Sequence, residues 1–201
     1  MLALETPRLV IRPFSLDDLD VIHRILDIEL ADAGADAEWS EIRHRRAEWL
    51  RWTILGYEQF GSLHQPPYGE RAVMLKRSGQ VIGACGYVPC LDRFEQIPGL
   101  SKPAPEVPMA FTIAELGLYY AISSAHQRQG YATEAARALI DYAFDELFLK
   151  RILATTTYDN AASIGVMRKL GMRVEKNPFP DPPWLQIVGV LDNPRLRGRK
   201  T

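Results

Sequence analysis

Residues 115–134 constrain the fold more than any other stretch, because they lead an apolar, aromatic strand through a short polar turn into a long helix. Gly130 lies at the bend of this turn, and the helix is expected to start at Tyr131. The first amides of a helix have no acceptor within the helix, and the helix dipole places about half a positive charge at that end. The stretch therefore predicts a binding site for an anion, above all a phosphate.

The turn has the spacing Gln/Arg-x-x-Gly-x-Gly/Ala over residues 127–132. Small residues at this spacing let a pyrophosphate approach the backbone, and the basic side chain adds positive charge. The segment resembles the acetyl-coenzyme A signature of the GNAT N-acetyltransferases. Its continuation, Tyr-Ala-Thr-Glu-Ala at 131–135, resembles the branch that includes the ribosomal-protein-alanine N-acetyltransferases. The alternative interpretation is an ordinary helix start.

A second motif strengthens this resemblance. Residues 160–172 are similar to the Asn-x-x-Ser/Ala … Gly-Phe/Met element that follows the fifth strand in the family, and residues 6–13 resemble its opening strand. The two motifs come in the family's order, with a helix and a strand expected between them. The combination predicts an acetyltransferase-type fold.

Composition excludes several other classes of protein. The 201 residues, 47% of them hydrophobic, are enough for one substantial core, and 24 Lys plus Arg against 25 Asp plus Glu favour neither nucleic acid nor a membrane as partner. No apolar run approaches the ~18 residues of a membrane span, and the first residues do not form a signal peptide, so we expect a cytoplasmic protein. Cys85 and Cys90 are too few for a cysteine metal site and would lie on opposite faces of one strand, so free thiols and no metal are expected.

Periodicity predicts the elements of the chain. Strands are expected at 4–14, 71–76, 80–88, 111–122, 150–158 and 184–191, and helices at 16–30, from a cap at Ser40 to about 57, at 131–148 and at 161–170. Ser15 and Asp18 have the spacing of a capping box, and Asn160 and Gly171 suit the two ends of the last helix. With the resemblance, this predicts a GNAT-like α/β (α+β) fold, with a mixed, mostly antiparallel sheet of about seven strands flanked by four helices. Residues 1–194 would form a single domain and 195–201 a disordered basic tail.

Residues 89–110 form a long segment with five prolines, at positions 89, 98, 103, 105 and 108. Its length and composition are unusual for a connection and unsuited to a sheet. By resemblance it would border the acceptor site as a substrate-selecting rim. A mobile insertion without function is the alternative.

The resemblance also implies a coenzyme site. Backbone groups of the strand before the turn would bind the pantetheine arm, and the amides of the turn would bind the pyrophosphate. The residues implied are Tyr120, Ala121, Ile122, Gln127, Arg128, Gln129, Gly130, Tyr131, Ala132, Thr133 and Asn160.

Acetylation of an amine needs a neutral nucleophile and a proton for the departing thiolate. Glu115 is the candidate base, since it shares a strand face with Gly117, which suggests an open cleft; an ion-paired or solvated carboxylate is the alternative. Many family members carry a tyrosine seven residues after the asparagine, where this chain has Met167, which cannot donate a proton.

Ser163 is the substitute proton donor that the resemblance implies, and a mere role in the helix cap is its alternative. Tyr158 is a third candidate for the thiolate's proton. His126 could be invoked as a base, although a histidine in such a turn more often contacts solvent or phosphate.

The function predicted is transfer of an acetyl group from acetyl-CoA to a primary amine, with the N-terminal amine of a protein or peptide as the first choice of acceptor. A small amine or an aminoglycoside is the alternative acceptor. A non-catalytic acetyl-CoA sensor is the alternative of another class. A homodimer is left open.

Overall fold

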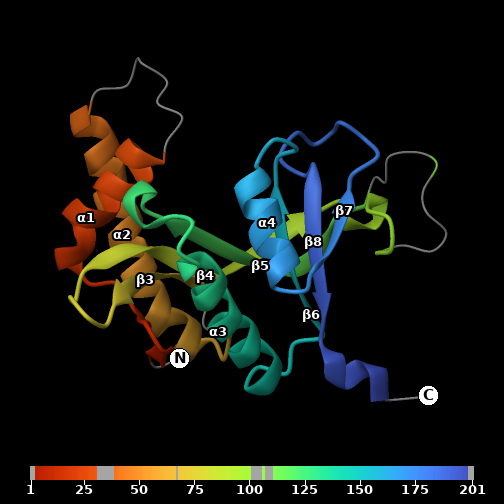
Figure 1. Cartoon of the computed structure of the whole chain (residues 1–201), viewed down its shortest axis with the longest axis horizontal. Coiled ribbons are helices and arrows are strands. Elements are labelled where there is room, and N and C mark those ends of the chain that lie inside the picture. The colour runs from red at the N-terminus through yellow and green to blue at the C-terminus, as the bar shows by residue number, and fades with distance from the viewer. Residues whose placement is uncertain (1–2, 31–38, 67, 101–105, 107–110, 199–201) are drawn as a thin grey trace. The chain divides into compact units, whose positions relative to one another are not determined.

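The computed structural model of the chain describes residues 3–30, 39–66, 68–100, 106 and 111–198 (Figure 1). Its four α-helices are α1 Leu19–His23, α2 Trp39–Ser62, α3 Tyr131–Asp145 and α4 Ala161–Lys169. The strands are β1 Leu4–Glu5, β2 Leu9–Arg12, β3 Gly69–Leu75, β4 Val81–Asp92, β5 Ile113–Ile122, β6 Arg151–Thr156, β7 Arg173–Lys176 and β8 Ile187–Asp192. They pair in one eight-stranded, mostly antiparallel sheet in the order β1-β2-β3-β4-β5-β6-β8-β7. The predicted mixed α/β fold is confirmed, with eight strands in place of about seven.

The chain divides into two compact units. The first unit comprises Met1–Tyr87 and Tyr119–Leu139, and the second comprises Val88–Leu118 and Ile140–Thr201. Both units therefore contain parts of β4, β5 and α3. Among the described helices, none is long and apolar enough to cross a membrane.

The opening strand predicted at 4–14 is in fact two short strands. β1 and β2 pair antiparallel, with Leu4 opposite Ile11, so the chain reverses between them. Thr6 stabilises the reversal, because its hydroxyl accepts the amide of Leu9 at 2.9 Å and its own amide donates to the carbonyl of Leu9 at 3.0 Å. The prediction of one continuous strand is wrong because alternation alone does not reveal such a turn.

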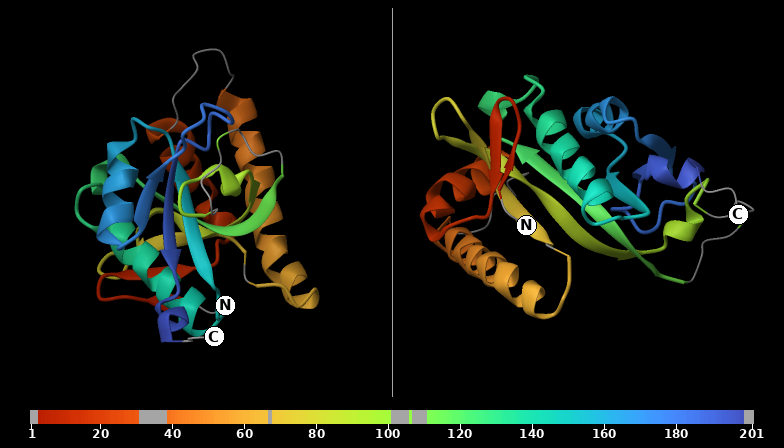
Figure 2. Two further views of the ribbon diagram at one scale, coloured as in Figure 1. Left: turned by 90° about the vertical axis from the view of Figure 1, so that its right-hand side faces the viewer. Right: turned by 90° about the horizontal axis from the view of Figure 1, so that it is seen from below.

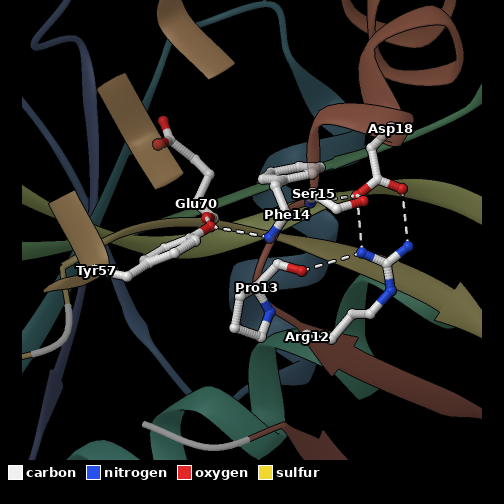
Figure 3. A network of polar contacts seen from close by, with 7 residues as sticks. All are labelled: Arg12, Pro13, Phe14, Ser15, Asp18, Tyr57 and Glu70. Carbon is white, nitrogen blue, oxygen red and sulfur yellow. Dashed lines mark hydrogen bonds and ion pairs between the residues drawn. The ribbon is translucent and has the colours of Figure 1, made fainter. Parts of the chain in front are cut away.

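The first helical segment begins with the predicted capping box. The amide of Ser15 donates to the carboxylate of Asp18 at 2.8 Å, and Arg12 donates to both oxygens of that carboxylate, at 2.7 and 2.8 Å (Figure 3). Burial alone would raise the pKa of Asp18, but the hydrogen bonds from Arg12 and Ser15 lower it below its ordinary value. After a 3-10 turn and α1, the chain continues as a π-helix, Arg24–Glu29.

The second helix differs at its start from the prediction. Ser40 lies inside α2, which the structure describes from Trp39, so Ser40 is not its N-cap. The glycine-containing break expected at 32–37 lies outside the described residues. α2 packs beside α1 and against β3, as the right-hand view of Figure 2 shows for the two helices, and it contributes Leu50 to the core.

The hairpin of β3 and β4 is confirmed, with Gly79 at φ +68° in its turn. β4 is longer than predicted and continues through Pro89 to Asp92, so the connection does not begin at residue 89. Phe94 and Ile97, in the segment predicted to be a rim or a mobile insertion, are buried in a core cluster with Leu153. Residues 101–105 and 107–110 of this segment lie outside the described part.

In the second unit, β6 pairs parallel to β5, with Gly117 opposite Leu153, which confirms the parallel strand predicted there. β8 lies between β6 and β7 and is antiparallel to both, with α4 packed beside them (Figure 1). The last strand begins at Ile187 and not at 184. Residues Pro194–Gly198 form a 3-10 helix in which Arg195 forms an ion pair with Asp145 at 2.6 Å. The disordered tail expected at 195–201 stays a prediction.

Candidate active site

The turn before α3, in the first unit, has the backbone geometry of an anion site. A 3-10 helix at Ser124–His126 leads to Arg128 at φ +60° and Gly130 at φ +85°. The amide of Glu134 donates to the carbonyl of Gly130 at 3.0 Å, the first hydrogen bond of the helix, so the preceding helical amides have no acceptor within it. A Cβ atom built on Gly130 would lie 3.4 Å from Arg8 Nη2, so the guanidinium of Arg8 lies beside this backbone. These residues fit a pyrophosphate.

The carboxylate of Glu29, at the end of the π-helix, stabilises the start of this turn at Ser123 and Ser124. Glu29 accepts a hydrogen bond from the hydroxyl of Ser123 at 2.5 Å and one from the amide of Ser124 at 3.1 Å. The hydroxyl of Ser123, more than any other group, lowers the pKa of Glu29. Gln127 donates to the carbonyl of Ile122 at 3.0 Å, so the side chain of this predicted coenzyme residue serves the turn itself.

Arg8 is a residue of this site that the sequence reasoning missed. Its Nε donates to Glu134 at 2.6 Å, its Nη1 donates to the carbonyl of Gln129 at 3.0 Å, and its guanidinium lies 4.4 Å from the centre of the Tyr131 ring. The hydroxyl of Thr6 also donates to Glu134, at 2.6 Å. These contacts fasten the β1–β2 turn to the first turn of α3 and bring a second cation, besides Arg128, to the anion site. No local sequence motif indicates that Arg8 belongs to this site, because Arg8 and Gln129 are 121 positions apart in the chain.

The strand that enters the turn holds the predicted pantetheine-binding residues Tyr120, Ala121 and Ile122. Gly83 of β4 lies so close that a Cβ atom built there would be 2.1 Å from the carbonyl oxygen of Ala121. The side chain of Ile122 is buried, and its carbonyl accepts the hydrogen bond from Gln127. The role of these three residues in binding stays a prediction.

Glu115, in the second unit, forms an ion pair. Arg151 donates to its Oε1 atom from Nε at 2.9 Å and also from Nη2, and the hydrogen bonding to Glu115 raises the pKa of Arg151. Gly117 itself leaves no open space, because a Cβ atom there would lie 2.5 Å from the Sγ atom of Cys90 and 3.0 Å from Val88. The ion-paired alternative considered for Glu115 therefore describes its contacts, while its role as base stays a prediction.

The second motif forms the start of α4 as predicted. The side chain of Asn160 accepts the amide of Ser163 at 2.9 Å and so caps the helix. Met167 is fully buried, with its sulfur 3.0 Å from where a Cβ atom on Gly189 would lie, so this position belongs to the core. The Tyr158 hydroxyl donates to the carbonyl of Asn177 at 3.1 Å.

His126, in the turn before α3, has a buried Nδ1 atom without a hydrogen-bond partner in the described part of the chain. Its ring centre lies 6.5 Å from that of Tyr131. The histidine therefore faces the start of the helix, and nothing in its contacts assigns it a role as base.

A polar cluster on β3, α2 and β5 of the first unit also escaped sequence reasoning. The Tyr57 hydroxyl donates to the carbonyl of Glu70 at 2.5 Å and accepts the amide of Phe14 at 3.2 Å (Figure 3). Burial raises the pKa of the Glu70 carboxyl. Burial, and then the charge of Glu70, raises the pKa of Tyr119 to about 12. No sequence motif marks this cluster, since its members are spread over three elements.

The fold and the turn define an α/β protein with a candidate anion site at a helix start. A model of the acetyltransferase (GNAT) domain matches residues 8–173, and the chain therefore belongs to the GNAT acetyltransferase family. The uncharacterized protein YkkB of Bacillus subtilis is 31% identical over 136 residues, which are 67% of this chain and 64% of YkkB. The match thus spans less than two thirds of that relative.

Two solved structures share the fold. The acetyltransferase from Agrobacterium tumefaciens superimposes with a TM-score of 0.63 at 20% identity, covering 95% of this chain and 94% of its own. The ribosomal-protein-S5-alanine acetyltransferase from Vibrio fischeri has a TM-score of 0.63 at 17% identity, covering 96% and 98%. At these identities the likeness establishes the fold.

Proposed function

We propose that this protein transfers an acetyl group from acetyl-CoA to a primary amine, and that the acceptor is the N-terminal amine of a protein or peptide. The observation that carries the proposal is the turn before α3 in a chain of the GNAT family. Its glycine at positive φ, its open helical amides and its two arginines suit a pyrophosphate. The choice of acceptor is supported by the Vibrio fischeri neighbour, whose name specifies alanine of a ribosomal protein.

In this proposal the coenzyme's pyrophosphate lies on the amides of residues 128–133, with Arg8 and Arg128 supplying charge, and the pantetheine arm runs along Tyr120–Ile122. The neutral amine attacks the thioester carbon, a C–N bond forms and the C–S bond breaks. The ammonium's proton passes to a base, and the thiolate takes up a proton. Glu115 and Ser163 are the proposed base and proton donor. Arg151 donates two hydrogen bonds to Oε1 of Glu115, so the proposed base already has a cationic partner.

The experiment is release of coenzyme A thiol from acetyl-CoA with a panel of acceptors: a tripeptide with a free amino terminus, a polyamine and an aminoglycoside. The proposal predicts release with the tripeptide, at a higher kcat/KM than with the other two. A higher kcat/KM with the polyamine or the aminoglycoside would contradict the peptide acceptor and indicate a small amine instead.

A non-catalytic acetyl-CoA sensor is the second candidate, and the ion pair that occupies Glu115 favours it. A sensor would give heat of acetyl-CoA binding in calorimetry and no thiol release with any amine. The two measurements together therefore separate the candidates.

A further inference from the structure

Glu70 of β3 and Tyr119 of β5 lie in one row across the sheet of the first unit. Glu70 is opposite Gly86 of β4. On the other side of β4, the Ser123 amide donates to the carbonyl of Ile82 at 2.8 Å and Gly83 lies against Ile122, a register that places Tyr119 opposite Gly86. Residues opposite one another in a sheet point to the same face, so the Glu70 and Tyr119 side chains share a face with only a glycine between them.

Gly86 also lies unusually close to the backbone of β3. A Cβ atom built on it would lie 2.2 Å from the carbonyl oxygen of Gly69 and 2.7 Å from the Cα atom of Glu70. The backbone of β3 therefore closes over Gly86, at a distance that any larger residue would prevent. The charge of Glu70 acts on the phenol of Tyr119, in agreement with their proximity.

The other charged groups near Glu70 already have partners. Arg46 of α2 donates to both oxygens of Asp27, at 2.9 and 2.6 Å, and His23 contacts the same carboxylate at 2.9 Å. Tyr57 contacts the backbone carbonyl of Glu70 and not its carboxylate, which turns away from that ring in Figure 3. Within the described part of the chain, no other side chain forms a hydrogen bond or ion pair with the Glu70 carboxylate.

We propose that Glu70 and Tyr119 bind the acceptor amine in its protonated form as it arrives, before it loses a proton and attacks as the neutral amine. The inference rests on the proposed function and assigns it an acceptor subsite. The charge of Arg46 acts on the Glu70 carboxylate, but the two form no ion pair in the described part of the chain, so an ammonium donor would add a directly hydrogen-bonded cation. The phenol oxygen of Tyr119 offers a second acceptor. Tyr119 directly precedes the strand residues proposed to hold the pantetheine arm. The subsite selects cationic acceptors over neutral alcohols or acids.

The test compares Glu70→Gln with wild type, because the amide keeps the shape and removes the charge. With the tripeptide as acceptor, KM for the amine should rise about tenfold or more, while the Kd for coenzyme A stays within about twofold. Tyr119→Phe should raise the same KM by a smaller factor. Glu58→Gln, an exposed glutamate on α2, is the matched control and should change neither value. An unchanged amine KM in Glu70→Gln overturns the proposal.

Calorimetry of the tripeptide with the protein saturated by coenzyme A tests the subsite without turnover. Binding to wild type that weakens about tenfold in Glu70→Gln supports the inference, and equal binding or no binding to wild type overturns it. Absence of thiol release from wild type refutes the proposed function instead, so the two failures are distinct. Should Glu70→Gln fail to fold, Glu70→Asp retracts the charge by one methylene, and an amine affinity equal to wild type would overturn the proposal.

Discussion

Arg151 on β6 donates two hydrogen bonds to a single carboxylate oxygen of Glu115 on β5, one of them from Nε at 2.9 Å. The side chain of Glu115 is 11% exposed and that of Arg151 is 23% exposed. The pair thus links two neighbouring strands at the carboxylate that sequence reasoning selects as the base, and it makes structural and catalytic roles of Glu115 separable by mutation.

Glu115→Gln is expected to lower turnover about 10²-fold if Glu115 is the base. It should also destabilise the protein by about 1 to 3 kcal/mol, because Arg151 loses its partner in a partly buried setting. Steady-state rates and thermal melting measure the two effects. The double variant Glu115→Gln with Arg151→Met should recover stability but not turnover. A variant that melts lower yet turns over normally would show that Glu115 serves only the ion pair.

Substitution of the two polar residues at the start of α4 should have different effects, one on stability and the other on turnover. Asn160→Ala removes the side chain that accepts the Ser163 amide and should cost about 1 kcal/mol of stability. Ser163→Ala keeps that cap. If its hydroxyl protonates the thiolate, turnover should fall about 10²-fold with little change in melting temperature. Normal turnover in Ser163→Ala would leave the thiolate's proton to Tyr158 or water.

The Arg12–Asp18 pair predicts a pH dependence of stability. Because the pKa of Asp18 is lowered from its ordinary value of 3.8, the pair stabilises the fold above that pH, and the stabilisation is lost as the pH falls through the lowered pKa. Asp18→Asn should therefore be less stable than wild type at pH 7, by about 1 to 3 kcal/mol. Urea unfolding at several pH values should show the difference shrinking in acid. A difference that is constant with pH would contradict the assignment.

The Glu70 carboxyl predicts a pH dependence of stability opposite in sign to that of the Arg12–Asp18 pair. Burial raises the pKa of its carboxyl above the ordinary value of 4.5, so the folded state loses stability as the pH rises from that value through the raised pKa. Glu70→Gln should be as stable as wild type in acid and equally or more stable at pH 7. The same urea series measures the stability difference between Glu70→Gln and wild type. A variant that is less stable than wild type at pH 7 but equally stable in acid would indicate that Glu70 forms an ion pair.

Local patterns predicted much of this fold, and distant contacts account for most of what they missed. The capping box at Ser15, the cap at Asn160 and the turn at Gly130 follow from residues a few positions apart, and all three were predictable. The partners of Glu115 and Gly117 are Arg151 and Cys90, which come from neighbouring strands, and the partner of Glu134 is Arg8, in the turn between β1 and β2. Pro89 was taken to end a strand, yet β4 continues through it, since a proline costs only one donor where the ladder does not need it.

The central claim, that the turn before α3 binds the pyrophosphate of acetyl-CoA, is tested most directly by calorimetry of coenzyme A with Gly130→Glu. The variant places a side chain and a negative charge where the pyrophosphate would lie, so the Kd should rise at least tenfold, about 1.4 kcal/mol. Gly79→Glu is the matched control, because Gly79 also has positive φ, at +68°, in the β3–β4 turn, with no atom within 4 Å of an added Cβ. Pyrophosphate binding at this turn predicts lost affinity in Gly130→Glu and wild-type affinity in Gly79→Glu. Wild-type affinity in a folded Gly130→Glu variant would contradict it.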